Sequence, residues 1–409
     1  MIGDPLFQQP DYRRFWMMRT AASLIMQIQS VAVGWHVYDL TGDPFALGFI
    51  GLVQFMPALL LALPAGQLVD RMPRRGILMA CILVNVICPA LIASLILTGE
   101  TSAWPIFLAV TLLGAARAFE MPAAAALLPG LVEREEFRRA VALNASGSQA
   151  AMIAGPAIGG LLYALHPAAP FLTCVALLGF NWICVSGIKR GRQAAEGKGQ
   201  PVTWDSMLAG LRFINSRPIL LGAISLDMVA VFLGGATALL PIFARDILEV
   251  GPVGLGVLRC APAIGALGMA LLLARRPLER RVGRKLFYSV AFFGAATIVF
   301  GFSENVFLSF AALVAMGVGD MVSVVIRSTL VQLSTPDSMR GRVSSVNSIF
   351  IGASNQLGEF ESGVLAGWFG PVPSAVIGGI GTILVAATWS RWFKPLWEID
   401  SLDLPPPEG

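Results

Sequence analysis

The chain has 409 residues, of which 56% are hydrophobic and 13% are charged, and its formal net charge is +4. Soluble proteins carry about 25% charged residues, so this chain has roughly half the charge that a soluble surface needs. This composition excludes a soluble enzyme, a disordered regulator, a coiled coil and a secreted disulfide scaffold, and it predicts a polytopic membrane protein.

The apolar segments are continuous and about 20 residues long, the length with which a helix crosses the hydrocarbon core. They lack the short alternating pattern of outer-membrane β-strands. The predicted fold class is therefore an all-α polytopic membrane protein with twelve transmembrane helices. We expect these helices at 15–38, 45–68, 77–97, 104–128, 141–164, 169–188, 218–243, 252–274, 285–302, 306–330, 343–367 and 373–393.

Lysine and arginine residues predict the orientation of these helices. With a cytoplasmic N-terminus, 24 of the 29 basic residues lie in cytoplasmic segments, and only Arg245 lies in an outer one. Both termini are therefore expected in the cytoplasm. The net positive charge follows from this bias, and we expect no nucleic-acid partner.

The sequence repeats itself at an offset of 203 residues, where RRAVALNASGSQAAMIAGPAIGGLL matches GRVSSVNSIFIGASNQLGEFESGVL. The repeat predicts two homologous six-helix bundles of parallel orientation. The expected parts are bundles at 1–188 and 218–394, a cytoplasmic linker at 189–217 and a short cytoplasmic tail at 395–409. Apolar residues at helical spacing predict an interfacial amphipathic helix in the linker, formed by Trp204, Met207, Leu208, Leu211 and Ile214.

The turn after the second span reads Gly66-Gln67-Leu68-Val69-Asp70-Arg71-Met72-Pro73-Arg74-Arg75. An acid beside arginines at a helix end can accept charge-assisted hydrogen bonds and face the N-terminus of a neighbouring helix. The segment resembles the 2–3 loop motif of the major facilitator superfamily, with Pro73 in place of the usual glycine. The resemblance implies that Asp70 stabilises the outward-facing state and assigns gating to Gly66, Asp70, Arg71, Arg74 and Arg75. The alternative for the arginines is simple orientation in the membrane.

The fifth span carries Gly155-Pro156-Ala157-Ile158-Gly159-Gly160, which resembles the motif of exporters and antiporters in this superfamily. Pro156 is expected to kink the helix, and the glycines allow close helix packing. We assign Gly155, Pro156, Gly159 and Gly160 to gating, with passive packing as the alternative. Over nearly its whole length the chain resembles the bacterial enterobactin-exporter-like branch, which implies a multi-pass protein of the bacterial inner membrane.

Charged residues inside the spans are costly and therefore indicate function. Asp227 lies in the seventh span with no cation nearby in sequence, which suits a carboxyl that binds and releases a proton. Arg259 is a candidate partner for it or an anchor for an anionic substrate, and a fixed structural ion pair is the alternative. Arg117 and Glu120 are three residues apart, so they can neutralise each other. Asp320 and Arg327 share one face of the tenth span, although Arg327 is close enough to the cytoplasmic end to extend toward it.

Two spans also carry polar stripes, which predict contact with a water-filled cavity or with another helix. One stripe contains Arg19, Ser23, Gln27 and Ser30, and the other contains Ser348, Asn355 and Glu359. We assign proton coupling to Asp227, Glu120 and Glu359. The predicted substrate cavity comprises Arg19, Gln27, Arg117, Arg259, Asp320 and Asn355.

The sequence thus predicts a proton-coupled secondary transporter that exports a small amphipathic molecule, of siderophore or drug type, by alternating access. A lipid or lysolipid flippase of the same fold is the second hypothesis, and a non-transporting membrane sensor is the third. The expected partners are the substrate, protons and membrane lipids, and we expect a monomer. We expect neither an enzyme nor a cofactor or metal, because no catalytic triad, metal cluster or phosphate loop is found in the sequence.

Overall fold

The computed structural model describes residues 5–189 and 204–401, apart from the side chains of Leu63, Asp70, Asp337, Ser338 and 204–207. This part of the chain is helical and contains no β-strand. The principal helices are α1 (Pro10–Thr41), α2 (Pro44–Arg71), α3 (Arg74–Thr98), α4 (Trp104–Leu127), α5 (Phe137–Leu165), α6 (Ala169–Ser186), α7 (Trp204–Ser216), α8 (Pro218–Leu233), α10 (Gly251–Arg275), α11 (Val282–Phe302), α12 (Val306–Leu333), α13 (Asp337–Phe369) and α14 (Pro371–Trp392). The shorter elements are η1 (Pro5–Gln8), η2 (Leu128–Gly130), η3 (Gly235–Leu239), α9 (Leu240–Ile242), η4 (Phe243–Ile247) and α15 (Lys394–Trp397).

Ten helical segments of the described chain are long and apolar enough to cross a membrane. The more polar helices α1 and α13 have 32 and 33 residues, which also exceeds the length that a bilayer requires. Together these segments agree with the predicted count of twelve. The predicted all-α membrane fold is confirmed.

The seventh predicted span differs from a single continuous helix. Helix α8 ends at Leu233, and residues 235–247 continue as the short elements η3, α9 and the π-helical η4. Gly234 and Gly235 weaken helix propagation at this point, and Pro241 has no backbone N–H to donate to the preceding turn. A Cβ atom at Gly235 would clash with the backbone of Gly358, so the break also lets α13 approach closely.

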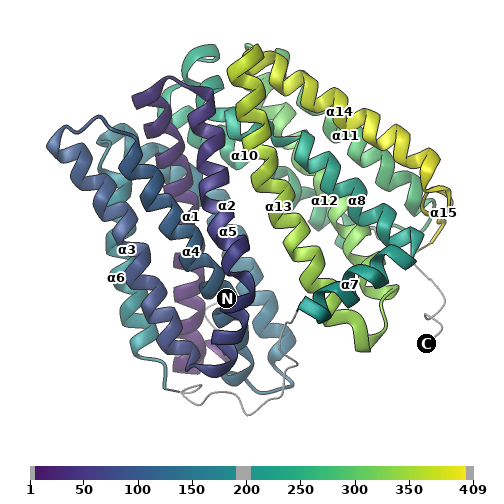
Figure 1. The fold of residues 1–409 in the computed structure, drawn as a ribbon, viewed down its shortest axis with the longest axis horizontal. Coiled ribbons are helices and arrows are strands. Elements are labelled where there is room, and N and C mark those ends of the chain that lie inside the picture. The colour runs from purple at the N-terminus through teal and green to yellow at the C-terminus, as the bar shows by residue number, and fades with distance from the viewer. Residues whose placement is uncertain (1–4, 190–203, 402–409) are drawn as a thin grey trace. The chain divides into compact units, whose positions relative to one another are not determined.

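The chain divides into two compact units by its internal contacts. Unit 1 comprises Met1–Gly42, Val53–Val202 and Gly251–Cys260, and unit 2 comprises Asp43–Leu52, Thr203–Val250 and Ala261–Gly409. In unit 1, α1 packs on α5 and α6, and α3 packs on α4 and α6 (purple to blue in Figure 1). In unit 2, α11 packs on α12 and α14, while α13 and α14 pack on α8 (teal to yellow in Figure 1).

The predicted amphipathic helix of the linker is present as α7. Its buried residue Ile214 packs in a cluster with Val343 and Val346 of α13, whereas Leu208 and Leu211 are exposed. One face of α7 therefore anchors it to unit 2, and the exposed leucines suit the predicted contact with lipid. Residues 190–203 of the predicted linker lie outside the described part of the chain.

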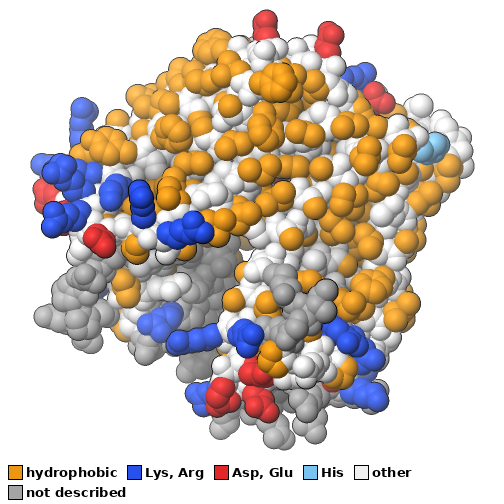
Figure 2. Space-filling model, turned by 180° about the vertical axis from the view of Figure 1, so that it is seen from behind, with side chains coloured by type: hydrophobic (Ala, Val, Ile, Leu, Met, Phe, Trp, Pro, Cys, Tyr) orange, Lys and Arg blue, Asp and Glu red, His pale blue; other side chains and the backbone are white. Residues whose placement is uncertain are grey.

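Hydrophobic side chains cover most of the face shown in Figure 2, whereas Lys and Arg lie in separate groups, mainly at the left edge and in the lower part of the view. The exposed arginines stand at helix ends, as at Arg71 after α2, Arg138 in the first turn of α5, Arg280 before α11 and Arg391 near the end of α14. A broad apolar surface with charges at the helix ends is the pattern expected for helices surrounded by lipid.

Candidate functional site

A buried ion pair joins two membrane helices of unit 2. Asp227 of α8 is 5% exposed and Arg327 of α12 is 6% exposed, and the Arg327 guanidinium donates to the Asp227 carboxylate. Moving two charges out of water costs several kcal/mol per ion, which only good pairing offsets. Removing either side chain would therefore leave a buried charge without its hydrogen-bonded partner.

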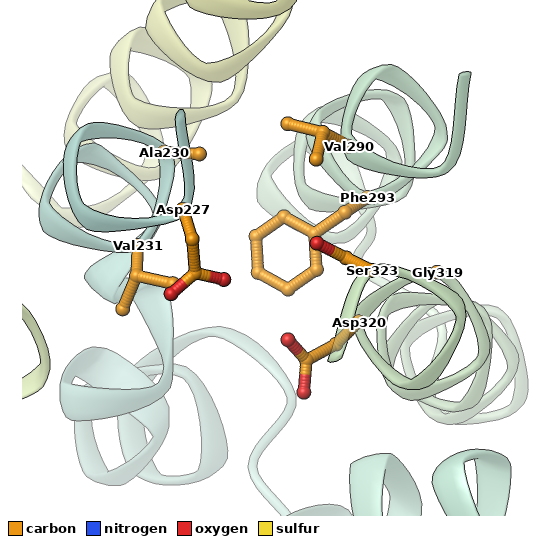
Figure 3. Close-up of a pocket in the computed structure, with 8 residues that line it drawn as sticks. All are labelled: Asp227, Ala230, Val231, Val290, Phe293, Gly319, Asp320 and Ser323. Carbon is orange, nitrogen blue, oxygen red and sulfur yellow. The ribbon is translucent and has the colours of Figure 1, made fainter. Parts of the chain in front are cut away.

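A second carboxyl lies in the same cluster. Asp320 precedes Arg327 by two helical turns on α12, and the charges of Asp227 and Arg327 both interact with it electrostatically. A pocket between α8, α11 and α12 is lined by Asp227, Ala230, Val231, Val290, Phe293, Gly319, Asp320 and Ser323. The two carboxyl groups project from different helices toward this pocket, beside the ring of Phe293 (Figure 3). We call Asp227, Asp320, Ser323 and Arg327 the acidic cluster.

The predicted partners of these charges need correction. The observed partner of Asp227 is Arg327, whereas Arg259 donates to the Ser30 hydroxyl at 2.8 Å. The suggestion that Arg327 extends to the cytoplasmic end is wrong, since its side chain is buried in the ion pair. The close packing of α8 on α12 decides this pairing, and it joins residues 100 positions apart in the sequence.

Unit 1 has its own cluster of polar groups, between α3 and α4. Glu120 accepts a hydrogen bond from the Asn85 side-chain amide at 2.8 Å. The neighbouring Gln29 amide of α1 contacts the thiol of Cys88 at 3.3 Å, and the charge of Arg117 also acts on that thiol. The neutral Asn85 was not anticipated as the partner of Glu120, for which local neutralisation by Arg117 was predicted.

The polar stripe of α1 contacts other helices of unit 1. The Ser23 hydroxyl bonds to Ser148 of α5 at 3.2 Å, and Ser30 accepts from Arg259 of α10. Gln27 lies against Gly155, where an added Cβ atom would be 2.5 Å from the Gln27 Cβ. Of the two predicted alternatives for this stripe, contact with another helix applies to these three positions, while Arg19 is partly exposed.

The second stripe, on α13, is more open. Asn355 is exposed and donates to the Ile351 carbonyl of its own helix at 2.8 Å. Glu359 is half-buried beside α2, where a Cβ atom at Gly51 would come within 3.1 Å of the carboxylate.

The arginines of the 2–3 loop bind helix ends within unit 1. Arg74 donates to the Ala126 carbonyl of α4 at 2.6 Å, and Arg75 donates to the Ile188 carbonyl after α6 at 3.1 Å. These bonds satisfy carbonyls that have no intrahelical donor. Arg71 is exposed and Gly66 has open space beside it. The side chain of Asp70 lies outside the described part of the structure.

Glycines create two close helix crossings. In unit 1, Gly155 and Gly159 of α5 face Gln27 and Ile28 of α1, and Gly160 contacts the backbone of Pro252 in α10. In unit 2, a Cβ atom at Gly363 of α13 would lie 2.6 Å from the Gly48 Cα of α2. Gly160 and Gly363 are equivalent positions of the sequence repeat, so each half places a glycine at the same kind of crossing.

The polar residues of the two clusters that sequence reasoning missed are Asn85, which binds Glu120, and Ser323, which lines the pocket. Ser323 shares a helix face with Asp320 and Arg327, at spacings of three and four residues, and this periodicity was the available signal. Within the described residues, no group of three or more His, Cys, Asp or Glu side chains is arranged to hold a metal ion. All five cysteines are buried and free.

Comparisons with known proteins identify the fold and the family. The sequence profile of the family described as transmembrane secretion effector, within the major facilitator superfamily, matches residues 4–408. Enterobactin exporters (EntS) of Shigella boydii serotype 18 and Escherichia coli O1:K1 are each 25% identical to it over 393 residues, covering 92% of this chain and 90% of theirs.

Solved structures of major facilitator transporters have the same fold. The nucleoside transporter NupG aligns with a TM-score of 0.73 at 12% identity, over 94% of this chain and 99% of that one. A bacterial homologue of the iron transporter ferroportin in an inward-facing state aligns with a TM-score of 0.68 at 15% identity, over 93% and 98%. The chain therefore belongs to the transmembrane secretion effector family of the major facilitator superfamily, whose members are membrane transporters and not enzymes.

Proposed function

We propose that the protein is a secondary active exporter of a small amphipathic molecule, of siderophore or drug type, driven by inward proton flow. Membership in a transporter family and the similarity to enterobactin exporters along most of the chain support the export of such a molecule. The observation that carries the coupling is the buried Asp227–Arg327 pair with Asp320 beside it.

The chemistry of coupling follows from the charges of the acidic cluster. A proton on Asp227 would remove the partner of Arg327 and leave the guanidinium free to turn toward Asp320, which is already within electrostatic reach. In a low-dielectric interior these two arrangements differ strongly in energy. If substrate binding favours one of them, protonation and export are coupled, because each ligand shifts the same conformational equilibrium. Glu120 and Glu359 are secondary candidates for proton binding.

The glycine crossings supply candidate gates for alternating access. Gly160 and Pro156 approach Pro252 and Gly256 so closely that side chains at the glycines would separate α5 from α10. Packing of this kind is held by short-range contacts, so a small tilt of either helix breaks it. Arg74 and Arg75 keep the ends of α3, α4 and α6 together during such a movement.

We place the protein in the bacterial inner membrane as a monomer with both termini in the cytoplasm. The exposed arginines at Arg71, Arg138, Arg280 and Arg391 then face the cytoplasm together. Contacts with the substrate are assigned to the exposed Asn355 and to five partly exposed residues, Arg19, Gln27, Arg117, Arg259 and Asp320.

The test is transport into proteoliposomes with an imposed pH gradient, using a panel of siderophores, cationic dyes and lysolipids. We expect the gradient to stimulate transport of a siderophore or a dye by wild-type protein. The double substitution Asp227→Asn with Arg327→Gln removes both charges of the pair, leaves Asp320 as the remaining charge of the cluster, and should abolish the stimulation. The matched control is Glu304→Gln, an exposed carboxyl in the loop between α11 and α12.

Gradient-independent transport by wild-type protein would refute proton coupling. Transport of lysolipids alone would support the flippase hypothesis and refute export of a siderophore or drug.

A further inference from the structure

The acidic cluster contains an unsatisfied hydroxyl group. Ser323 is 4% exposed, and its Oγ atom has no hydrogen-bond partner among the described residues. The hydroxyl points into the pocket between α8, α11 and α12 (Figure 3). A buried hydroxyl without a partner costs free energy, so an occupant of the pocket that contacts this oxygen would be favoured.

The charges around the pocket leave one negative charge in excess. Asp227 and Asp320 are the charged residues that line it, and the single guanidinium of Arg327 is bound to Asp227. The facing helix α11 contributes the uncharged Val290 and Phe293. An occupant carrying one positive charge would therefore neutralise the cluster, whereas a divalent ion would give the cluster a net positive charge.

The size of the pocket limits the occupant further. It has room for an occupant about the size of one water molecule. A small ion therefore fits this space better than an organic molecule. The available protein ligands are carboxylate and hydroxyl oxygens, which suit hard cations rather than soft transition metals.

We propose that Asp320, Ser323 and Asp227 form a binding site for one small monovalent metal cation, with sodium as the probe. The Asp320 carboxylate supplies the uncompensated charge, the Ser323 hydroxyl supplies a neutral oxygen, and Asp227 binds the ion while keeping its contact with Arg327. This site goes beyond proton-driven export, and its binding can be measured without transport.

The test is the thermal unfolding of the purified full-length protein in detergent, with sodium chloride replacing choline chloride at constant ionic strength. We expect a saturable rise in the unfolding temperature of about 2–4 °C with sodium. Ser323→Ala and Asp320→Asn should each abolish the rise. Ser328→Ala, an exposed serine on the same helix, should keep it.

Equal unfolding temperatures in sodium and choline at every pH would overturn the proposal and leave the pocket to a proton or a water molecule. A sodium-dependent rise that persists in Ser323→Ala and Asp320→Asn would also overturn it, since the ion would then bind elsewhere. If Asp320→Asn does not fold, Ser323→Ala alone decides. Failure of gradient-driven transport would contradict the proposed coupling but would not affect this binding measurement.

Discussion

Helix α4 of unit 1 and helix α12 of unit 2 lie at equivalent positions of the sequence repeat, yet their polar side chains have different surroundings. Arg117 and Glu120 of α4 stand 203 residues before Asp320 and Ser323 of α12, which is the offset of the sequence repeat. Glu120 is bound by the neutral amide of Asn85, whereas Asp320 shares Arg327 with a second carboxyl, Asp227.

This difference indicates which of the two clusters is better suited to bind and release a proton during transport. A carboxylate hydrogen-bonded to an amide keeps its partner in either protonation state, because an amide can both donate and accept. An ion pair buried at both ends loses its main attraction when one partner is neutralised. We therefore expect the acidic cluster of unit 2 to respond to a charge change far more strongly than the Glu120 cluster of unit 1.

The largest effect is expected for Asp227→Asn alone. It leaves the Arg327 charge buried without its partner, which should destabilise the protein by about 3–5 kcal/mol. Adding Arg327→Gln should restore most of the stability. Thermal or denaturant unfolding in detergent measures both variants, and equal stability of wild type and Asp227→Asn would break the proposed contrast between the halves.

The two glycine crossings should behave alike. Gly160→Ala and Gly363→Ala each place a methyl group against a neighbouring backbone, which should cost about 1–3 kcal/mol and slow transport. Gly179→Ala on α6 is the matched control, because nothing lies within 4 Å of the added Cβ atom. If only one of the two crossings is sensitive in transport assays, the gates of the two halves are not equivalent.

Loss of the Arg75 side chain should have a smaller effect. Arg75→Ala removes hydrogen bonds to the carbonyls of Ser186 and Ile188, at a cost of about 1.5 kcal/mol. The exposed Arg71 provides the comparison, and Arg71→Ala should change the unfolding free energy by less than about 0.5 kcal/mol. Similar losses for both would mean that the bonds of Arg75 add nothing to stability.

The smallest effect is expected for Glu120→Gln. Glutamine keeps an acceptor for the Asn85 amide, so the free energy of unfolding should change by about 1 kcal/mol or less. The response of transport to a pH gradient should remain. Loss of that response in Glu120→Gln would move the coupling group to unit 1.

Much of the fold was predictable because membrane helices leave a strong signal in length and hydropathy. The twelve spans follow from the length and hydropathy of the apolar segments. The amphipathic helix α7 follows from the helical spacing of its apolar residues. The break after Leu233 was missed, although Gly234, Gly235 and Pro241 mark it, because an apolar run looks the same in a broken helix as in a continuous one.

The site was only partly predictable from the sequence. The sequence identified Asp227, Asp320 and Arg327 as costly charges within the membrane, but their pairing depends on how α8 packs on α12. Arg259 was a candidate partner of Asp227 because it lies at a similar fraction of the next predicted span. The positions of Ser323 beside the pocket and of Asn85 beside Glu120 also depend on tertiary packing. Polar uncharged residues are common in membrane helices and give no comparable signal in the sequence.

Proton coupling can be measured directly as proton release when substrate binds to the purified protein in weakly buffered detergent solution. The probe is the siderophore or dye that the liposome panel identifies as transported. We predict that wild-type protein and Glu120→Gln release protons on binding it, whereas Asp227→Asn with Arg327→Gln binds it without release. Proton release from the double variant equal to that of the wild type would contradict the account.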